Sequence, residues 1–440
     1  MAKKAIIAAA AIAVAASGAQ AQSDRKQLDA AESDPARLGW IQGTPPPADK
    51  QIKFDDGSYF RFPQLRWSFS NWRQFFPTLP LHRGDASAHA FSRAERDDID
   101  ALTFTPLGSD KPMSWKEALA ANYTDAIIVL HKGKIVYERY MGVTNPASQH
   151  IAFSVTKSYI GTLAASLAAE GKLDPDKLVT DYVPELADSG FAGATVRQVM
   201  DMTTGIAFDE TYTNADADII RHARAGRAAP RRADYNGPDG FLAFLPTIGK
   251  QGEHGERFTY RTANSDALGW IITRATGTPV REQLEQRFWS KLGMEQDAAL
   301  VVDAQGTPFA GGGLMLSLRD MARFGEMMRQ GGKWNGKQVV PAAAIADITK
   351  GGGKVEFAKN GAYPTLPGWS YRNQWWVSHN DHGAYMARGI HGQAIYIDPK
   401  AEMVIARFAS HPVAGNVAID PTSIPAYKAL GRLLAEQPKR

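Results

Sequence analysis

The chain has 440 residues, with 50 lysines and arginines against 46 aspartates and glutamates, so its formal charge of +4 is small for its length. This balance gives no electrostatic argument for a nucleic acid as partner. The sequence contains no cysteine, which excludes disulfides, thiol catalysis and cysteine-ligated zinc. The length allows a large core in two or three structural units.

Residues 1–21 have the pattern of a secretory signal peptide. Lys3 and Lys4 form a charged start, residues 6–16 an apolar core, and Ala19-Gln20-Ala21 a small-residue cleavage site. Residues 1–21 contain no twin-arginine pair, and the chain has no cysteine to carry a lipid. Elsewhere no apolar run approaches the roughly 18 residues of a membrane span. We therefore expect a periplasmic or secreted protein without a stable membrane anchor.

Residues 22–100 are predicted to form an irregular leader. The segment contains Pro45-Pro46-Pro47, followed by Trp67, Trp72, Phe75, Phe76 and Leu79 among basic residues. These aromatic side chains could form a ligand surface, but more often such residues pin an extended arm onto a neighbouring domain. After the leader, residues 101–180 and 300–440 are expected to form an α/β domain, and residues 181–299 a mostly helical domain.

A predicted β-hairpin precedes the most informative motif of the sequence. Apolar residues at 126–130 and 135–139 flank a short polar turn. Beyond them, Ser154-Val155-Thr156-Lys157 opens the longest helical pattern, which ends near Gly171. Residues three apart are neighbours on a helix, so the Lys157 amine can reach the Ser154 hydroxyl.

Serine needs an adjacent base to act as a nucleophile at neutral pH. Lysine can be that base only if its pKa falls from about 10.4 to roughly 7–8. Burial and the positive end of a helix both disfavour the charged amine, and the start of a buried helix supplies both conditions. The alternative is that Ser154 merely caps the helix, and these residues alone do not decide between the two.

The middle of the chain is predicted to be largely helical. A short helix covers 196–202 and an amphipathic helix covers 267–275, directly after Tyr260. Tyr260 is followed by Ala263-Asn264, and Tyr-x-Asn occurs at 212–214 and 371–373, so spacing alone does not identify a catalytic tyrosine. Five arginines lie between the two helices: Arg221, Arg224, Arg227, Arg231 and Arg232. They could recognise a carboxylate, although a solvated face is the commoner role.

The last third of the chain returns to mixed structure. A glycine-rich segment at 311–313 leads into a helix over 318–329, and a second hairpin pairs 394–397 with 403–408 before a final helix over 425–434. Strands therefore come from both ends of the chain, with helical sequence between them. This order predicts an α/β (α+β) fold, in which helices flank an antiparallel sheet, a mostly helical region is inserted, and a cleft lies at the junction.

Four motifs in a fixed order resemble a known superfamily. They are Ser154-Val155-Thr156-Lys157, Tyr260 ahead of Ala263-Asn264, Gly312-Gly313 running into 317–323, and the segment 389–393. With Gln374-Trp375-Trp376, they make residues 120–412 similar to the serine β-lactamase/penicillin-binding protein superfamily. Within it, the chain looks most like 6-aminohexanoate-dimer hydrolases and class C β-lactamase-like (family VIII type) esterases.

The resemblance implies a β-lactamase-like fold and a serine hydrolase that needs no cofactor. Ser154 would attack the carbonyl to form an acyl-enzyme, Lys157 would take its proton, and Tyr260 would relay a proton to the leaving group. The backbone N–H groups of Ser154 and Ile390 would form the oxyanion hole. Substrate contacts are expected from five further residues: Tyr212, Trp376, His391, Gly392 and Gln393.

Departures from the pattern bear on the substrate. His391-Gly392-Gln393 stands where β-lactamases carry Lys-Thr-Gly, so the cation that holds a β-lactam carboxylate is missing. Ala223, directly after His222, occupies a position where efficient dimer hydrolases place an acidic residue to hold the substrate ammonium. Gly311 replaces their asparagine. The expected substrate is therefore a small-molecule ester, and a linear amide such as the 6-aminohexanoate dimer is a further option.

Other functions remain open from sequence alone. A D-amino-acid peptidase, a weak β-lactamase, and a penicillin-binding protein that acylates without turnover share the same motifs. Tyr260 argues against the last of these, because a binder has no need of a proton relay. A metal hydrolase is not expected, since no His-Glu-x-x-His pattern occurs. The sequence does not determine the oligomeric state.

Overall fold

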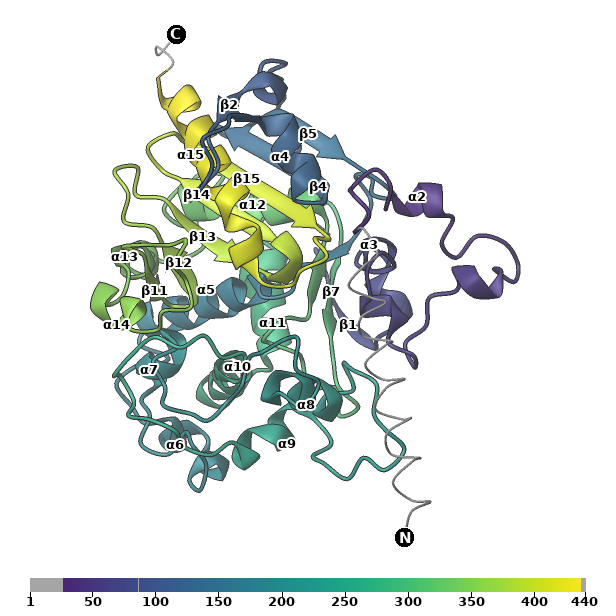
Figure 1. Cartoon of the computed structure of the whole chain (residues 1–440). Helices are drawn as coiled ribbons and strands as arrows, with labels where there is room; N and C mark the ends of the chain where they lie inside the picture. The colour runs from purple at the N-terminus through teal and green to yellow at the C-terminus, as the bar shows by residue number, and fades with distance from the viewer. Residues whose placement is uncertain (1–26, 86, 437–440) are drawn as a thin grey trace, which may run out of the picture.

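The computed structural model describes residues 27–85 and 87–436, so the predicted signal peptide lies outside the described residues. A seven-stranded antiparallel sheet forms the centre (Figure 1). Its strands, in spatial order, are β11 (Ser370–Arg372), β12 (Trp375–Val377), β13 (Tyr385–Arg388), β14 (Ala394–Asp398), β15 (Met403–Ala409), β4 (Thr124–His131) and β5 (Lys134–Tyr140). Both predicted hairpins are present, and β15 pairs with β4 to join the late strands to the early ones.

Alternation along β4 explains why the sheet is covered on both faces. Successive side chains of a strand point to opposite faces. Ile128 and Leu130 belong to one hydrophobic core, whereas Ile127 and Val129 belong to another. All four side chains are fully buried, so both faces of the sheet need a helical layer.

Two sets of helices supply these layers. The first core contains residues of α5 (Val155–Ala169), α10 (Ala263–Thr276), α12 (Leu318–Arg329) and α13 (Ala342–Lys350). The second contains residues of α4 (Trp115–Ala121) and α15 (Asp420–Ala435), which lie on the opposite face (Figure 1). This arrangement is the expected β-lactamase-like fold, an antiparallel sheet flanked by helices.

The middle of the chain contributes the helices around α10 in the lower part of Figure 1. They are α6 (Val179–Tyr182), α7 (Val196–Met200), α8 (Asp218–Ala225), α9 (Phe241–Phe244) and α11 (Val280–Leu284). α10 begins at Ala263, four residues before the predicted start. Its first turn contains Asn264, Ser265 and Asp266, which are polar yet at most 1% exposed. A search for apolar periodicity does not detect such a turn, because the buried residues of the turn are not hydrophobic.

A second, smaller sheet ties the leader to the rest of the chain. Its strands, in spatial order, are β1 (Thr78–Leu81), β7 (Ala298–Val301), β8 (Leu314–Leu316) and β6 (His150–Ile151). Trp67, Trp72 and Phe76 are buried in a third hydrophobic cluster, which also contains Ile151 and Phe153. The packing interpretation of the aromatic leader is therefore confirmed for these side chains.

The remaining elements are short. They are α2 (Pro35–Leu38), α3 (Leu65–Ser68), α14 (Lys354–Ala358), β2 (Thr103–Phe104), β3 (Met113–Ser114), β9 (Lys333–Trp334) and β10 (Lys337–Gln338). Within the described residues, no helix combines the length and apolar character needed to cross a bilayer.

Candidate active site

Ser154 immediately precedes α5 and faces the cleft. Its hydroxyl makes no capping hydrogen bond to the first turn of the helix, so the alternative in which it merely caps the helix is wrong. Instead the Lys157 amine, one turn later, donates to Ser154 Oγ at 3.0 Å. The side chains therefore have the nucleophile–base contact that the spacing predicted.

The backbone before Ser154 is held in an unusual conformation by the leader. Phe153 has φ +44°, a left-handed value that is uncommon for a residue with a bulky side chain. Its ring packs edge-on against Phe69 and Trp72, with centroids 4.9 and 5.5 Å away. The leader thus fixes the turn that presents Ser154.

Lys157 is 1% exposed. Besides Ser154 Oγ, its amine donates to the carbonyl oxygen of Gly311. Burial lowers the pKa of Lys157 to about 8, although the carboxylates of Glu210 and Asp266 oppose this shift. An amine with this pKa is neutral in about a tenth of molecules at pH 7, far more than an ordinary lysine, and so it can act as a general base.

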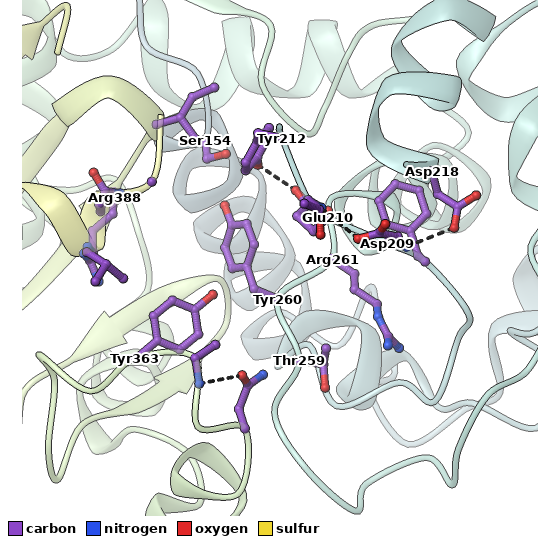
Figure 2. A pocket seen from close by; sticks show the side chains of 18 of the residues that line it. Ser154, Asp209, Glu210, Tyr212, Asp218, Thr259, Tyr260, Arg261, Tyr363 and Arg388 are labelled. Atoms are coloured by element: carbon purple, nitrogen blue, oxygen red, sulfur yellow. Dashed lines mark hydrogen bonds between the residues drawn. The ribbon is translucent and has the colours of Figure 1, made fainter. Parts of the chain in front are cut away.

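Tyr260 points its hydroxyl toward Ser154 (Figure 2), and the Ser154 side chain acts on the pKa of Tyr260. Its ring stacks on Trp376 with centroids 5.6 Å apart, and Lys157 Nζ lies 5.2 Å from its ring centroid. Burial raises the pKa of Tyr260 well above its usual value. The phenol therefore stays protonated in the free protein, which suits a group that gives a proton to a leaving group.

Two backbone donors at the site have no partner of their own. Among residues 27–85 and 87–436, neither the Ser154 N–H nor the Ile390 N–H donates a hydrogen bond. Both residues line the cleft. These are the two donors expected to form the oxyanion hole.

Three of the predicted substrate contacts need correction, because His391, Gly392 and Gln393 do not line the cavities beside Ser154. All three are buried. The His391 Nδ1–H donates to the carbonyl of His411 at 2.6 Å, and burial lowers the pKa of His391 to about 4. The Gln393 amide group donates to the carbonyl of Ile390 at 3.1 Å. These residues support the loop that carries Ile390, and a neutral, buried imidazole cannot hold a substrate carboxylate.

Two cavities meet at Ser154. The larger, about 770 Å³, is open and is lined by residues that include Glu210, Tyr212, Tyr260 and Trp376. The smaller, about 200 Å³, is also lined by Ser154. Aromatic and aliphatic side chains dominate its lining, which includes Tyr59, Phe60, Trp72, Ile219, Ile220, Ala223 and Phe309. The leader therefore contributes to the site directly, so the ligand-surface alternative also applies to Trp72, which packs in the core and lines this cavity.

Comparison with known proteins agrees with this geometry. Residues 117–424 match the family described as Beta-lactamase. The chain belongs to the β-lactamase family. It is 35% identical over 356 residues to the 6-aminohexanoate-dimer hydrolase of Paenarthrobacter ureafaciens, which covers 81% of this chain and 88% of that protein.

This β-lactamase-family chain is also similar to solved structures of hydrolases. A candidate 6-aminohexanoate-dimer hydrolase from Bacillus anthracis superposes with a TM-score of 0.78 at 32% identity, covering 87% of this chain and 97% of that chain. A family VIII carboxylesterase superposes with a TM-score of 0.52 at 16% identity, covering 78% and 100% of the two chains, and shares the fold. The protein is thus a serine hydrolase of the β-lactamase-related type.

Sequence reasoning missed two carboxylates of this β-lactamase-family site. Glu210 accepts a hydrogen bond from the Tyr212 hydroxyl at 2.7 Å (Figure 2). It accepts another from the Thr262 N–H at 2.9 Å. Asp266 accepts one from the Gly311 N–H at 3.1 Å. Glu210 lies in a loop whose sequence has no motif or periodicity that would point to it. Asp266 could have been noticed as an acidic residue in a polar turn at the start of an otherwise apolar helix.

The lowered pKa of Lys157 predicts a pH dependence. Only the neutral amine can accept the Ser154 proton, so kcat/KM for an ester should rise as pH increases through about 8, the pKa of Lys157, and then level off. Initial rates from pH 5 to 10, with a Ser154→Ala sample as blank, measure this rise, which is the acid limb of the pH–rate profile. A rate that is flat between pH 6 and 9 would contradict the role of Lys157 as the base.

Proposed function

We propose that this protein is an exported serine hydrolase that cleaves carboxylic esters, and linear amides more slowly, through an acyl-enzyme on Ser154. The observation that carries the proposal is the 3.0 Å hydrogen bond between Ser154 Oγ and a buried lysine amine of lowered pKa. Export rests on the signal-peptide pattern of residues 1–21. It is tested by sequencing the N-terminus of the protein recovered from the periplasm or medium.

The steps follow from the positions of the groups. Lys157 accepts the proton of Ser154 as Oγ attacks the carbonyl carbon, and the N–H groups of Ser154 and Ile390 stabilise the resulting oxyanion, each by about 2.7–4 kcal/mol. Tyr260 donates its proton to the leaving oxygen or nitrogen, and Lys157 returns a proton to the tyrosinate. Water, deprotonated by the same pair of groups, then releases the acid and restores Ser154.

The small cavity favours an uncharged acyl group. Within the part of the chain that the structure describes, no lysine, arginine, aspartate or glutamate lines it. A substrate ammonium placed there would lose its hydration without gaining a carboxylate partner, and burial of an unpaired charge is strongly unfavourable. Ala223, at the position where the resemblance implies an acidic residue, leaves this side of Ser154 apolar. We therefore assign this cavity to an aliphatic or aromatic acyl chain of a few carbons.

Gly311 fits the same interpretation. A Cβ atom at this position would lie 2.5 Å from the Thr262 methyl group and 3.1 Å from an Asp266 oxygen. An asparagine, which the resemblance implies in dimer hydrolases, could enter only if this wall moved. The wall is therefore adapted to a glycine and provides no amide group to a substrate.

On the leaving-group side, the cleft does not favour a β-lactam carboxylate. The guanidinium that faces Tyr260 from β13 belongs to Arg388, which forms an ion pair with buried Asp420 and lies 4.8 Å from the Trp376 ring centroid. A β-lactam carboxylate would compete with that ion pair. Ester and amide hydrolysis needs no such cation, and so it is the function that this geometry supports best.

A matched pair of substrates tests the acyl preference. p-Nitrophenyl hexanoate and p-nitrophenyl 6-aminohexanoate have the same chain length and differ by one terminal ammonium. We expect kcat/KM to favour the hexanoate by about 100-fold or more, because the ammonium would be buried unpaired. Ala223→Asp should improve the aminohexanoate by about 10–100-fold and weaken the hexanoate.

The control for this variant is Ala223→Asn, which has nearly the same shape and no charge. It should weaken both esters without favouring the ammonium. Equal kcat/KM values for the two esters in the wild-type protein would contradict the assignment of the small cavity to an uncharged acyl chain.

A further inference from the structure

Behind the nucleophile lies a cluster of titratable side chains that the proposed mechanism uses only in part. Lys157 on α5, Asp266 on α10 and His222 on α8 are each at most 1% exposed. Only Lys157 contacts Ser154. Asp266 and His222 bring ionisable groups from two different helices into the wall of the active site, where neither takes part in the proposed steps.

Gly311 connects Lys157 to Asp266. Its carbonyl accepts a hydrogen bond from the Lys157 amine, and its N–H donates to Asp266 Oδ1 at 3.1 Å. A carboxylate therefore fixes the single residue whose carbonyl holds the amine. The tight contacts around Gly311, with Asp266 3.1 Å from a Cβ built there, leave this link little freedom.

The hydrogen bond to Gly311 does not by itself account for an acid at position 266. An asparagine could accept the same N–H, and it would avoid the penalty of several kcal/mol for burying a carboxylate. Moreover, Asp266 Oδ2 has no hydrogen-bond partner among the described residues. A buried carboxylate with an unused oxygen is stabilised by a nearby cation, and so the charges that face it decide its role.

His222 is not that cation. Its Nε2 lies 3.5 Å from Asp266 Oδ2, yet burial and the positive charge of Lys157 lower the pKa of His222 to about 3. The imidazole therefore stays neutral, packed against Phe241 and Phe309. The remaining cation that acts on Asp266 is Lys157, whose charge lowers the pKa of the carboxyl.

Four groups face the Lys157 amine from the elements around it. They are Glu210 in the cleft loop, His222 on α8, Tyr260 before α10, and Asp266 on α10. Glu210 already accepts hydrogen bonds from Tyr212 and Thr262, and Tyr260 and His222 are neutral. Both Glu210 and Asp266 act on Lys157 through their charges, and Glu210 acts more strongly. Of the two, Asp266 is the one that is also linked to the amine through the two hydrogen bonds of Gly311.

We propose that Asp266 is a positioning residue for Lys157: it anchors Gly311, which holds the amine, and it adds to Glu210 a second, buried negative charge that affects how readily the amine loses its proton. This inference rests on the proposed function, in which Lys157 activates Ser154. A direct ion pair would stabilise the charged amine and spoil the base, whereas burial alone would make the amine too weak a base. Gly311 lies between the Asp266 carboxylate and the Lys157 amine. The carboxylate therefore stabilises the charged amine less than a direct ion pair would.

The pKa values have the sign that this arrangement requires. Burial lowers the pKa of Lys157 to about 8, and the Asp266 charge opposes the change. Burial raises the pKa of Asp266 to about 7, and the Lys157 charge opposes that change. The two groups therefore titrate as a pair, and a change in one has to appear in the other.

Asp266→Asn tests the proposal, because it keeps the acceptor for Gly311 and removes the charge. The pKa of Lys157 should fall, so the acid limb of kcat/KM for p-nitrophenyl hexanoate should move to lower pH by about one unit or more. The rate on the high-pH plateau should stay within about tenfold of wild type. A uniform loss at every pH, with the limb unmoved, would show that Asp266 is only structural.

Asp320→Asn is the matched control. Asp320 is also a buried acid in the first turn of a helix, α12, where it accepts hydrogen bonds from two backbone N–H groups and pairs with Arg323. Its replacement should lower the melting temperature without moving the acid limb. A shift as large as that of Asp266→Asn would overturn the proposal.

A second measurement does not depend on the folding of Asp266→Asn. In protein labelled with ¹³C at aspartate carboxyls, a resonance that titrates near pH 7 should move to higher pH in Lys157→Met, because the opposing cation is gone. If no such resonance responds, the inference fails. If instead Ser154→Ala retains its activity, the proposed function itself fails, so the two failures are distinguishable.

Discussion

Replacing Ser154 with alanine is expected to lower kcat/KM for p-nitrophenyl hexanoate by about 10⁴-fold or more, because the nucleophile of the acyl-enzyme is lost. The fold should be unaffected, since the Ser154 hydroxyl makes no capping hydrogen bond. Initial rates together with thermal unfolding measure both effects. Residual turnover within tenfold of wild type would contradict the assignment of Ser154.

Ser158→Ala provides the control on the same helix. The Ser158 hydroxyl is buried and donates to the carbonyl of Gln374 at 2.7 Å, away from Ser154. Its loss should lower stability by about 1 kcal/mol and leave kcat/KM within tenfold of wild type. A comparable loss of activity in both variants would mean that the helix, rather than the nucleophile, had been damaged.

Lys157→Met is expected to reduce kcat by about 10²–10⁴-fold, the usual contribution of a positioned proton carrier. Methionine fills a similar volume but cannot accept the Ser154 proton. The rise in rate with pH that we expect near pH 8 for wild type should also disappear, because the group that titrates there is gone. A pH–rate profile of the variant measures both effects.

Lys172→Met separates this effect from a general loss of charge. Lys172 lies just beyond the end of α5, and its side chain is 58% exposed and pairs with Glu170. Its removal should change neither kcat nor the position of the acid limb in the pH–rate profile. If Lys157→Met kept the limb near pH 8, another group would have to be the base.

Patterns with a clear period were predictable from the sequence. The helix predicted over 318–329 has those bounds in the structure, and both hairpins formed because alternating or continuous apolar runs were bounded by turns. The contact between Ser154 and Lys157 followed from helical spacing alone. In each case a local rule, rather than a distant contact, determined the result.

Contacts between distant segments were not predictable in the same way. Asp266 meets Gly311 across 45 positions, and the leader reaches Phe153 through packing that no local pattern encodes. The short strands β6 and β8 have too few residues to show a period. His391 was assigned to the substrate because of its place in a motif, but burial and a backbone acceptor decide its role.

The most direct test of the central claim is to label the protein with a fluorophosphonate, which reacts with activated serine nucleophiles, and to map the adduct by peptide mass spectrometry. We expect one adduct per chain, on Ser154, with esterase activity falling in proportion to labelling and no adduct on Ser154 in Lys157→Met over the same time. Full loss of activity with the adduct on another residue, or full activity with Ser154 completely labelled, would contradict it.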